Sequence, residues 1–510
     1  MALIAITFSC ISWSCRNNAQ PAVTFDPSRT HELEQYGSSL ISELPIPGIS
    51  MIVINGDSLF YHTFGSRSLA DSINSPLFET TPIFTGNISP IMVITGIFKL
   101  AAEGKIDLND PVTKYLPEFA LGNSDVSGIT IEHLMGQTAG IPYHESIWDK
   151  PDFSPQALSR TTQSIRLQPA EFSPAGSRVK RSPYNFDILA DLISKVSHME
   201  FEDYMQSHIL KPLGMNDSFF PKDDKFKYKV AQPHQISNAI TYAIDTIDLY
   251  PTNREHAGSI GFHGSTKDLA SWIYMLLHQG STVNSEIFLP RKWTELMFTS
   301  LPIDKNTAVG YGWEISSSKH GNIFEQYHTM GGFSAHIALV PDKKMGIVLL
   351  SNLTSNLDLR SISAKLMYWL SSSENKLPKE QPLLAQTLGK EFSRTQQVSK
   401  VIALYDSLKL NKPDLYDYKL ESLSQFGVNL LYHSRDSKTA IDFFKECIDR
   451  FPSNAEAHLN LAEAFLVDHQ YNKCKPVLIQ AKELLSKDKT AAGSIYERIA
   501  ILENAIGKHQ

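Results

Sequence analysis

The spacing of apolar residues predicts a helix that begins directly after a short extended segment at residues 82–84. Apolar side chains recur at the helical interval; they are Ile91, Ile94, Phe98 and Ala101 or Ala102. Gly86 separates the extended segment from the helix. Asn87 is a favourable helix N-cap and Pro90 is tolerated in a first helical turn, so both fit a helix start. The pattern therefore predicts a strand, a turn and a helix whose tip carries Asn87.

Alternation of apolar and polar positions predicts antiparallel strands before and long after this helix. Asn55-Gly56-Asp57-Ser58 is typical of a hairpin turn. The predicted strands are 49–54 and 59–65 in the first hairpin, and 335–340 and 345–350 in a second one. Helical spacing also predicts helices over 29–44 and 357–370. We therefore expect an α+β fold, with an antiparallel sheet flanked by helices.

The chain length and its composition indicate two structural units. A chain of 510 residues exceeds what one hydrophobic core usually organises. Hydrophobic residues make up 42% and charged residues 20%, which is ordinary for a globular protein. We expect a large domain over 28–372, a polar linker over 373–386 and a helical unit over 387–510. The net charge of −7 argues against a nucleic-acid partner.

Residues 1–20 are similar to a secretory signal or a lipoprotein leader. They are mostly apolar and small, although no Lys or Arg precedes Arg16. Cys10 and Cys15 each follow a serine, so either could carry a lipid anchor; incidental cysteines after a cleaved signal are the alternative. We expect an exported protein, periplasmic or an outer-membrane or cell-surface lipoprotein of a bacterium, with membrane contact only through such an anchor.

From Glu421 onward, two blocks of 34 residues resemble the tetratricopeptide repeat. Small residues occupy equivalent packing positions, and larger ones lie between them. The small residues are Ala440, Cys447, Cys474 and Ala481, and the larger ones are Phe444 and Leu478. Residues 495–506 are expected to form a capping helix. The resemblance implies a surface that binds a protein partner; a purely stabilising helical appendage is the alternative.

Several phrases of the large domain resemble one enzyme superfamily. They are E-G-K-I-D-L-N-D-P-V-T-K-Y-L-P-E-F at 103–119, I-E-H-L-M-G-Q-T-A-G-I-P at 131–142, and K-P-L-G-M at 211–215. This wording is similar to that of class C β-lactamases, penicillin-binding proteins and D-alanyl-D-alanine carboxypeptidases. The resemblance covers roughly residues 30–370. It implies the β-lactamase and transpeptidase fold and a serine hydrolase ancestry.

The first catalytic motif of that superfamily, S-x-x-K, would fall on Asn87 and Pro90. Residues three apart on a helix are neighbours, so a lysine amine there can take the serine proton and create a nucleophile. An amide is no acyl-accepting nucleophile, and proline carries no base. The sequence therefore predicts that this helix tip has lost both catalytic groups.

The two other catalytic motifs are also altered. The Tyr-x-Asn motif would fall on Arg181-Ser182-Pro183, which puts Arg181 and Pro183 at the degenerate positions; a slipped register would bring Tyr184 or Asn185 into the site instead. The (K/H)-T-G motif is similar to His328-Thr329-Met330 on an expected edge strand. His328 and Thr329 match, and Met330 would narrow the gap that glycine leaves for substrate.

We therefore expect a catalytically degenerate protein that acts by binding a ligand or a protein partner. Ser89 has no lysine three residues on, so it is interpreted as a surface serine. Ser182, Tyr184, His328, Thr329 and Met330 are the cleft candidates. A small peptide-like or ester ligand would bind there, and neither a metal nor another cofactor is expected. The alternative is an active esterase or peptidase with a site rearranged around His328, Ser182 or Tyr184.

Overall fold

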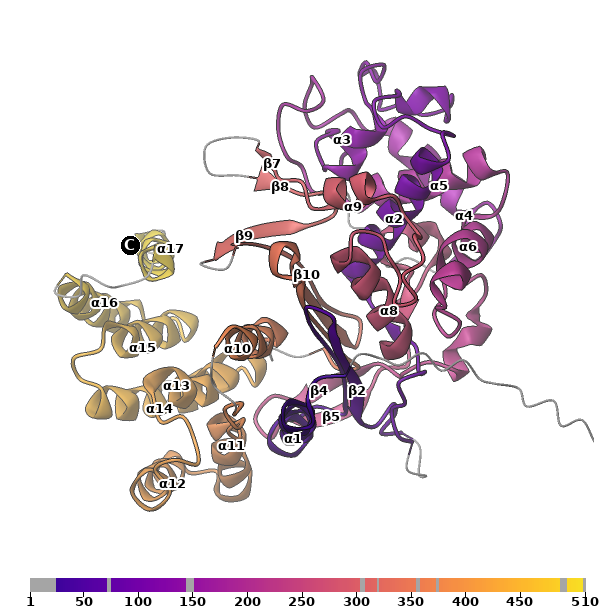
Figure 1. The fold of residues 1–510 in the computed structure, drawn as a ribbon. Coiled ribbons are helices and arrows are strands. Elements are labelled where there is room, and N and C mark those ends of the chain that lie inside the picture. The colour runs from indigo at the N-terminus through magenta and orange to yellow at the C-terminus, as the bar shows by residue number, and fades with distance from the viewer. Residues whose placement is uncertain are drawn as a thin grey trace, which may run out of the picture.

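A computed structural model describes residues 24–510 except 71–74, 144–150, 303–307, 319–320, 355–357, 373–375, 487–492 and 508–510. The expected leader at 1–20, with Cys10 and Cys15, lies outside the described residues. The expected linker at 373–386 lies partly outside them. Figure 1 shows the large unit with its sheet and the group of C-terminal helices beside it.

Eight of the described strands of the large unit form one antiparallel sheet, in the order β2-β1-β12-β11-β10-β9-β8-β7, and four others form two separate two-stranded sheets. Their bounds are β1 Gly48–Asn55, β2 Ser58–Gly65, β7 Leu301–Pro302, β8 Ala308–Val309, β9 Glu314–Ser318, β10 Gly321–Met330, β11 Phe333–Val340 and β12 Met345–Ser351. Both predicted hairpins are present, with strands slightly longer than expected. Flanking helices complete the predicted α+β fold, which is confirmed.

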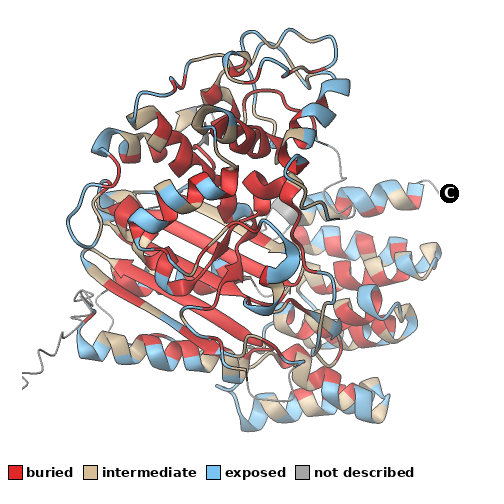
Figure 2. Ribbon diagram, turned by 90° about the vertical axis from the view of Figure 1, so that its right-hand side faces the viewer, coloured by how far each residue is buried: buried red, intermediate tan, exposed pale blue. Residues whose placement is uncertain are grey.

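Side chains of the central strands enter two separate cores, because successive residues of a strand point to opposite faces. On β11, Ala335, Ile337 and Leu339 belong to the larger core, whereas Val340 belongs to the smaller one. Every residue of β11 and β12 is buried. Figure 2 shows this band of buried strands between the helical layers.

Helices cover both faces of the sheet. The larger core lies beneath α2 (Ser89–Ala102), α5 (Tyr184–Ser197) and α8 (Thr266–Leu277), and the smaller one beneath α1 (Pro27–Glu43) and α10 (Leu359–Ser371). Shorter elements connect them. These are β3 Ile83–Phe84, α3 Ile131–Met135, α4 Ala157–Ser164, α6 Phe201–Tyr204, β4 His234–Asn238, β5 Ala243–Thr246, α7 Ala257–Ile260, β6 His263–Gly264 and α9 Arg291–Met297.

The C-terminal unit is helical from Leu384 onward. Its helices are α11 Leu384–Thr395, α12 Val398–Asn411, α13 Leu420–Val428, α14 Ser437–Arg450, α15 Ala455–Val467, α16 Tyr471–Leu485 and α17 Gly493–Gly507. The small residues Ala440, Cys447, Cys474 and Ala481 are all buried between them. The thiols of Cys447 and Cys474 are free, so the two cysteines act as packing residues.

The hairpin of β4 and β5 joins the two units. Ile240 at its turn belongs to the core of the C-terminal helices. Asn429 donates a hydrogen bond from Nδ2 to the carbonyl of Ala239, at 2.8 Å. At Gly389 the backbone carbonyl of Ile240 is so close that an added Cβ would lie 1.7 Å from it. Among the described helices, none has the length and apolar character to cross a membrane.

Candidate functional site

The tip of α2 is shaped by Gly86 and Asn87. Gly86 adopts a φ of +52°, and a Cβ there would lie 2.2 Å from the ring of His328. Asn87 lies in a 3₁₀ turn, Gly86–Ile88, where its exposed side chain donates a hydrogen bond from Nδ2 to the Tyr327 carbonyl at 2.9 Å. The expectation that Asn87 caps the helix is wrong, because the turn directs its amide to β10 instead.

Pro90 and Ser89 occupy the first turn of α2. Pro90 lies in this turn as expected. Ser89, however, is fully buried, and its Oγ accepts a hydrogen bond from the backbone amide of Phe262 at 2.9 Å. The interpretation of Ser89 as a surface serine is therefore wrong. Its hydroxyl ties α2 to the loop before β6 and is not presented to the cleft.

β10 presents the predicted His328-Thr329-Met330 motif. β10 is an interior strand in the sheet order. The expectation that this motif lies on an edge strand is wrong in this sense. The pairing of β9 with β10 nevertheless runs only from Gly321 to Glu325. His328 lies beyond that pairing and keeps β11 as its partner through Ala335. This part of β10 therefore forms a local edge beside the tip of α2.

The three side chains of this motif have different environments. His328 is 5% exposed, and burial lowers its pKa from 6.5 to about 4. It is therefore neutral at pH 7 and supplies no positive charge to a carboxylate. The hydroxyl oxygens of Thr329 and Ser334 lie 3.3 Å apart. Met330 is 47% exposed at the end of β10.

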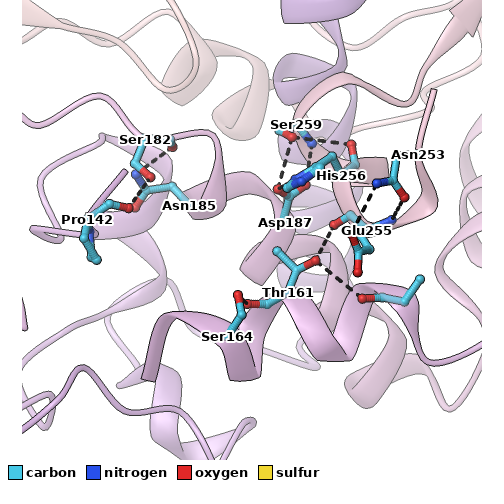
Figure 3. Close-up of polar contacts among 11 residues, drawn as sticks. Pro142, Thr161, Ser164, Ser182, Asn185, Asp187, Asn253, Glu255, His256 and Ser259 are labelled. Carbon is cyan, nitrogen blue, oxygen red and sulfur yellow. Dashed lines mark hydrogen bonds and ion pairs between the residues drawn. The ribbon is translucent and has the colours of Figure 1, made fainter. Parts of the chain in front are cut away.

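The loop before α5 carries Arg181, Ser182 and Pro183, on which the sequence places the Tyr-x-Asn motif. Pro183 is the N-cap residue of α5, and Arg181 forms an ion pair with Glu314 of β9. Ser182 is 1% exposed and donates from Oγ to the Pro142 carbonyl at 3.0 Å, as Figure 3 shows. Among the described residues this proton is therefore held by a carbonyl oxygen and not by a basic side chain that would make Ser182 a nucleophile.

Gln137 fixes that loop to the rest of the site. Its Oε1 accepts hydrogen bonds from the Ser182 amide at 2.9 Å and from Nδ2 of Asn185 at 2.6 Å. Tyr184, the alternative from a slipped register, is 1% exposed, and its ring packs against His256 with 5.7 Å between the ring centroids. Tyr184 and Asn185 thus pack within the fold behind the loop.

A cavity of about 510 Å³ brings most of the predicted site residues together. Asn87, Pro90, Arg181, Ser182, Pro183, His328, Thr329 and Met330 all line it; Tyr184 does not. Aromatic and amide side chains complete the wall. They include Tyr143, Phe186, Trp313, Tyr327, Gln137 and Gln326. This volume is within the range of about 300–1,000 Å³ that small-molecule sites occupy.

Ser259 is a cleft residue that the sequence did not single out as chemical. It lines the cavity and donates from Oγ to Oδ2 of Asp187 at 3.1 Å. His256 binds the same oxygen through Nδ1 at 2.9 Å (Figure 3). In a Ser-His-Asp triad the imidazole lies between the other two groups. Here the carboxylate lies between them, so the imidazole cannot take the Ser259 proton in this arrangement.

Charge in the cleft is carried by one pair. Among the lining residues that the structure describes, Arg181 is the single Lys or Arg residue, and Glu314 is the single Asp or Glu residue. Their side chains are 67% and 42% exposed, and exposed pairs contribute less than about 1 kcal/mol. Within the described part of the chain, no three His, Cys, Asp or Glu side chains are grouped to hold a metal ion.

The chain is similar to several curated bacterial proteins. The chain is 28% identical over 324 residues to Protein flp of Staphylococcus aureus strain MW2, with 61% of this chain and 60% of the relative covered. It is 27% identical over 347 residues to the putative penicillin-binding protein PbpX of Bacillus subtilis, covering 67% of this chain and 80% of PbpX. The chain thus spans about 60% of the length of the flp relatives.

Solved structures share the fold. The octameric penicillin-binding protein homologue from Pyrococcus abyssi aligns with a TM-score of 0.55 and 22% identity, over 73% of this chain and 82% of that one. A β-lactamase/D-alanine carboxypeptidase from Yersinia pestis, complexed with citrate, aligns with a TM-score of 0.55 and 20% identity, over 68% of this chain and 99% of that one. The model of the Beta-lactamase family matches residues 37–367. The chain therefore belongs to the Beta-lactamase family.

Proposed function

We propose that this protein binds a small peptide-like or ester ligand in the cleft without hydrolysing it. The observation that carries the proposal is the tip of α2, where the amide of Asn87 donates to a backbone carbonyl and Pro90 follows in the first turn. Neither side chain can form an acyl-enzyme. Removing the nucleophile of a serine hydrolase typically costs roughly a millionfold in turnover.

The cleft keeps features that favour binding. Its wall combines aromatic surface with a local strand edge at residues 326–330. The buried atoms His328 Nε2 and Trp313 Nε1 have no hydrogen-bond partner among the described residues. Because the Arg181–Glu314 pair is largely exposed, a ligand carboxylate can displace Glu314 from the guanidinium at small cost. These groups support a ligand with an apolar body and few polar contacts.

A binding experiment with a turnover readout tests the proposal. Acetyl-D-alanyl-D-alanine is titrated into the full chain by calorimetry, and the mixture is then analysed for released D-alanine. We expect binding with the dipeptide recovered intact. Val179→Trp on the cleft wall should weaken binding about tenfold by filling the cavity. Val283→Trp, at an exposed position outside the lining, should leave it unchanged.

Two outcomes would contradict the proposal. Release of D-alanine at a rate that scales with protein concentration would make the chain a hydrolase of the alternative type. Equal binding by Val179→Trp and the unmodified chain would place the dipeptide outside the cleft.

We also infer that the C-terminal helices bind a protein partner in the manner of tetratricopeptide repeats. Support comes from the 34-residue spacing of the buried small residues and from large apolar side chains that stay exposed on α15 and α17, namely Val467, Tyr496 and Ile501. To test this, the full chain and the double variant Tyr496→Ser with Ile501→Ser are each cross-linked in a bacterial host, and the partner proteins that they capture are compared. Export with a possible lipid anchor stays a prediction, which fractionation of the same cells would check.

A further inference from the structure

A second cavity lies on the opposite side of the sheet from the cleft. It has a volume of about 350 Å³ and lies between α10 and the outer face of β9, β10 and β11. On β11 its lining residues are His336, Ala338 and Val340, which alternate with the three residues that enter the larger core. Figure 1 shows α10 on the side of the sheet that faces the C-terminal helices. We call this cavity the α10 groove.

The α10 groove has a polar end and an apolar end. Glu325, His336 and Arg360 line the first, and Val340, Met345 and Met367 line the second. Arg360 lies near the start of α10 and Ser371 at its end. At about 1.5 Å per residue, these two lining residues are roughly 16 Å apart along the helix. The groove is therefore elongated, and its polarity changes along its length.

At the polar end, His336 has an unused hydrogen-bonding atom. Its side chain is 2% exposed, and Nε2 lies 3.2 Å from Oε2 of Glu325. A carboxylate only accepts hydrogen bonds, so Nε2 carries the proton and donates. Nδ1 of the same ring has no partner among the described residues. A buried polar atom of this kind favours a ligand whose head group can hydrogen-bond to it.

The charges at this end argue for an uncharged head group. Glu325 receives hydrogen bonds from His336 and from Ser316 Oγ, the latter at 3.1 Å. Arg360 donates from Nε to Asp358 at 3.2 Å and stacks 4.8 Å above the ring of Tyr327. Because Glu325 and Arg360 both have partners already, a charged head would lose its hydration without gaining a free counter-charge. A hydroxyl or amide can hydrogen-bond to His336 and accept from Arg360 without bringing a charge.

We propose that the α10 groove is a second ligand site, which binds a small uncharged amphiphile. The hydroxyl or amide head lies at the His336 end, and the alkyl chain lies along α10 toward Met345. This site is separate from the cleft, so it does not depend on whether the cleft binds or hydrolyses anything.

Methionine methyl groups provide the test, because the two sites contain different ones. Met345 and Met367 line the α10 groove, whereas Met330 lines the cleft. The full chain, labelled with ¹³C at its methionine methyls, is titrated with octan-1-ol and followed by NMR. We expect the Met345 and Met367 signals to move together while Met330 stays in place. Octanoate and octylammonium should bind about fivefold more weakly, because each charged head loses its hydration while Glu325 and Arg360 keep their own partners.

A blocking variant on the same helix makes the assignment specific. Ala364 is exposed and lines the groove, so Ala364→Phe should fill it without disturbing the core and weaken octanol binding about tenfold. Ser361→Phe, at an exposed position of α10 outside the lining, should bind as the unmodified chain does. Shifts confined to Met330, full affinity in Ala364→Phe, or equally tight binding of octanoate would each overturn the proposal.

Discussion

The polar groups buried in the large unit, here called the buried layer, and those in the cleft wall are organised in different ways. In the buried layer, Arg254 donates from Nε and Nη2 to the two carboxylate oxygens of Glu202 at 2.6 and 2.9 Å, and the side chains are 6% and 3% exposed. In the wall, Asn87 and Arg181 are exposed, and each has one partner across the cleft, Tyr327 or Glu314. The buried layer holds a charge pair out of water, whereas the wall is open to water.

This difference explains how the fold can persist when residues of the cleft wall are replaced. Removing one partner from the buried layer leaves an uncompensated charge in the interior, which is strongly destabilising. Replacing a group in the wall exchanges one contact for hydration, at a small cost. Asn87 and Pro90 lie in the wall, so the loss of catalytic groups that we propose there would leave α2 in place.

The largest expected effect comes from the buried layer. Arg254→Met would leave the Glu202 carboxylate unpaired at 3% exposure, and we expect a loss of about 3–5 kcal/mol in the free energy of unfolding by urea. Arg291→Met, which breaks the exposed pair with Glu295, is the matched control and should cost less than about 1 kcal/mol. Similar losses in both variants would mean that burial does not distinguish the two regions.

The next effect concerns the backbone under the tip of α2. Gly86→Ala adds a Cβ that would collide with His328 at a positive φ, and we expect a loss of about 3 kcal/mol in unfolding free energy. Gly104→Ala also has a positive φ, of +70°, but meets nothing within 4 Å. It should cost only about 1–2 kcal/mol. Equal costs would show that the contact between Gly86 and His328 is not tight.

A smaller effect should appear as a pH dependence of stability. Burial alone lowers the pKa of His256, but the hydrogen bond and charge of Asp187 outweigh it and raise this pKa above 6.5. A raised folded-state pKa stabilises the fold below about pH 6.5, and the contribution disappears as the pH rises through the folded value. The unfolding free energy should therefore fall between neutral and alkaline pH, and His256→Gln should remove that slope. A slope that persists in the variant would assign it to another group.

The smallest effect is expected in the wall itself. Arg181→Gln breaks the exposed pair with Glu314 and should change the unfolding free energy by less than about 1 kcal/mol. The same variant should weaken binding of a carboxylate ligand in the cleft, measured by calorimetry, more than it affects stability. A loss of stability well above this limit would place Arg181 among the structural residues.

Regular elements could be predicted from the sequence because their signals are local. The alternation at 49–54 and 59–65 and the turn at Asn55-Gly56 gave a hairpin that the structure extends by a residue or so at its ends. Pro90 was placed correctly in the first turn of α2. Of the residues that the family phrases placed at the cleft, those from Asn87 to Met330 line one cavity, except Tyr184.

What could not be predicted depends on long-range packing. The side chain of Asn87 is directed by a carbonyl 240 residues away, so its local preference for an N-cap did not decide its role. Ser89 is buried because the loop at Phe262 packs on α2. The α10 groove joins residues 318–345 to a helix at the end of the large unit. Helical spacing alone contains no information about contacts between segments that are far apart in the sequence.

Covalent labelling by a serine-directed probe tests the central claim most directly. The full chain and the double variant Asn87→Ser with Pro90→Lys are incubated with a fluorescent penicillin and with a fluorophosphonate, and any adduct is mapped by peptide mass spectrometry. We predict no adduct on any serine between residues 30 and 370 of the unmodified chain, and labelling of the double variant at position 87. An adduct on Ser182, Ser259 or another serine of the unmodified chain would contradict the account.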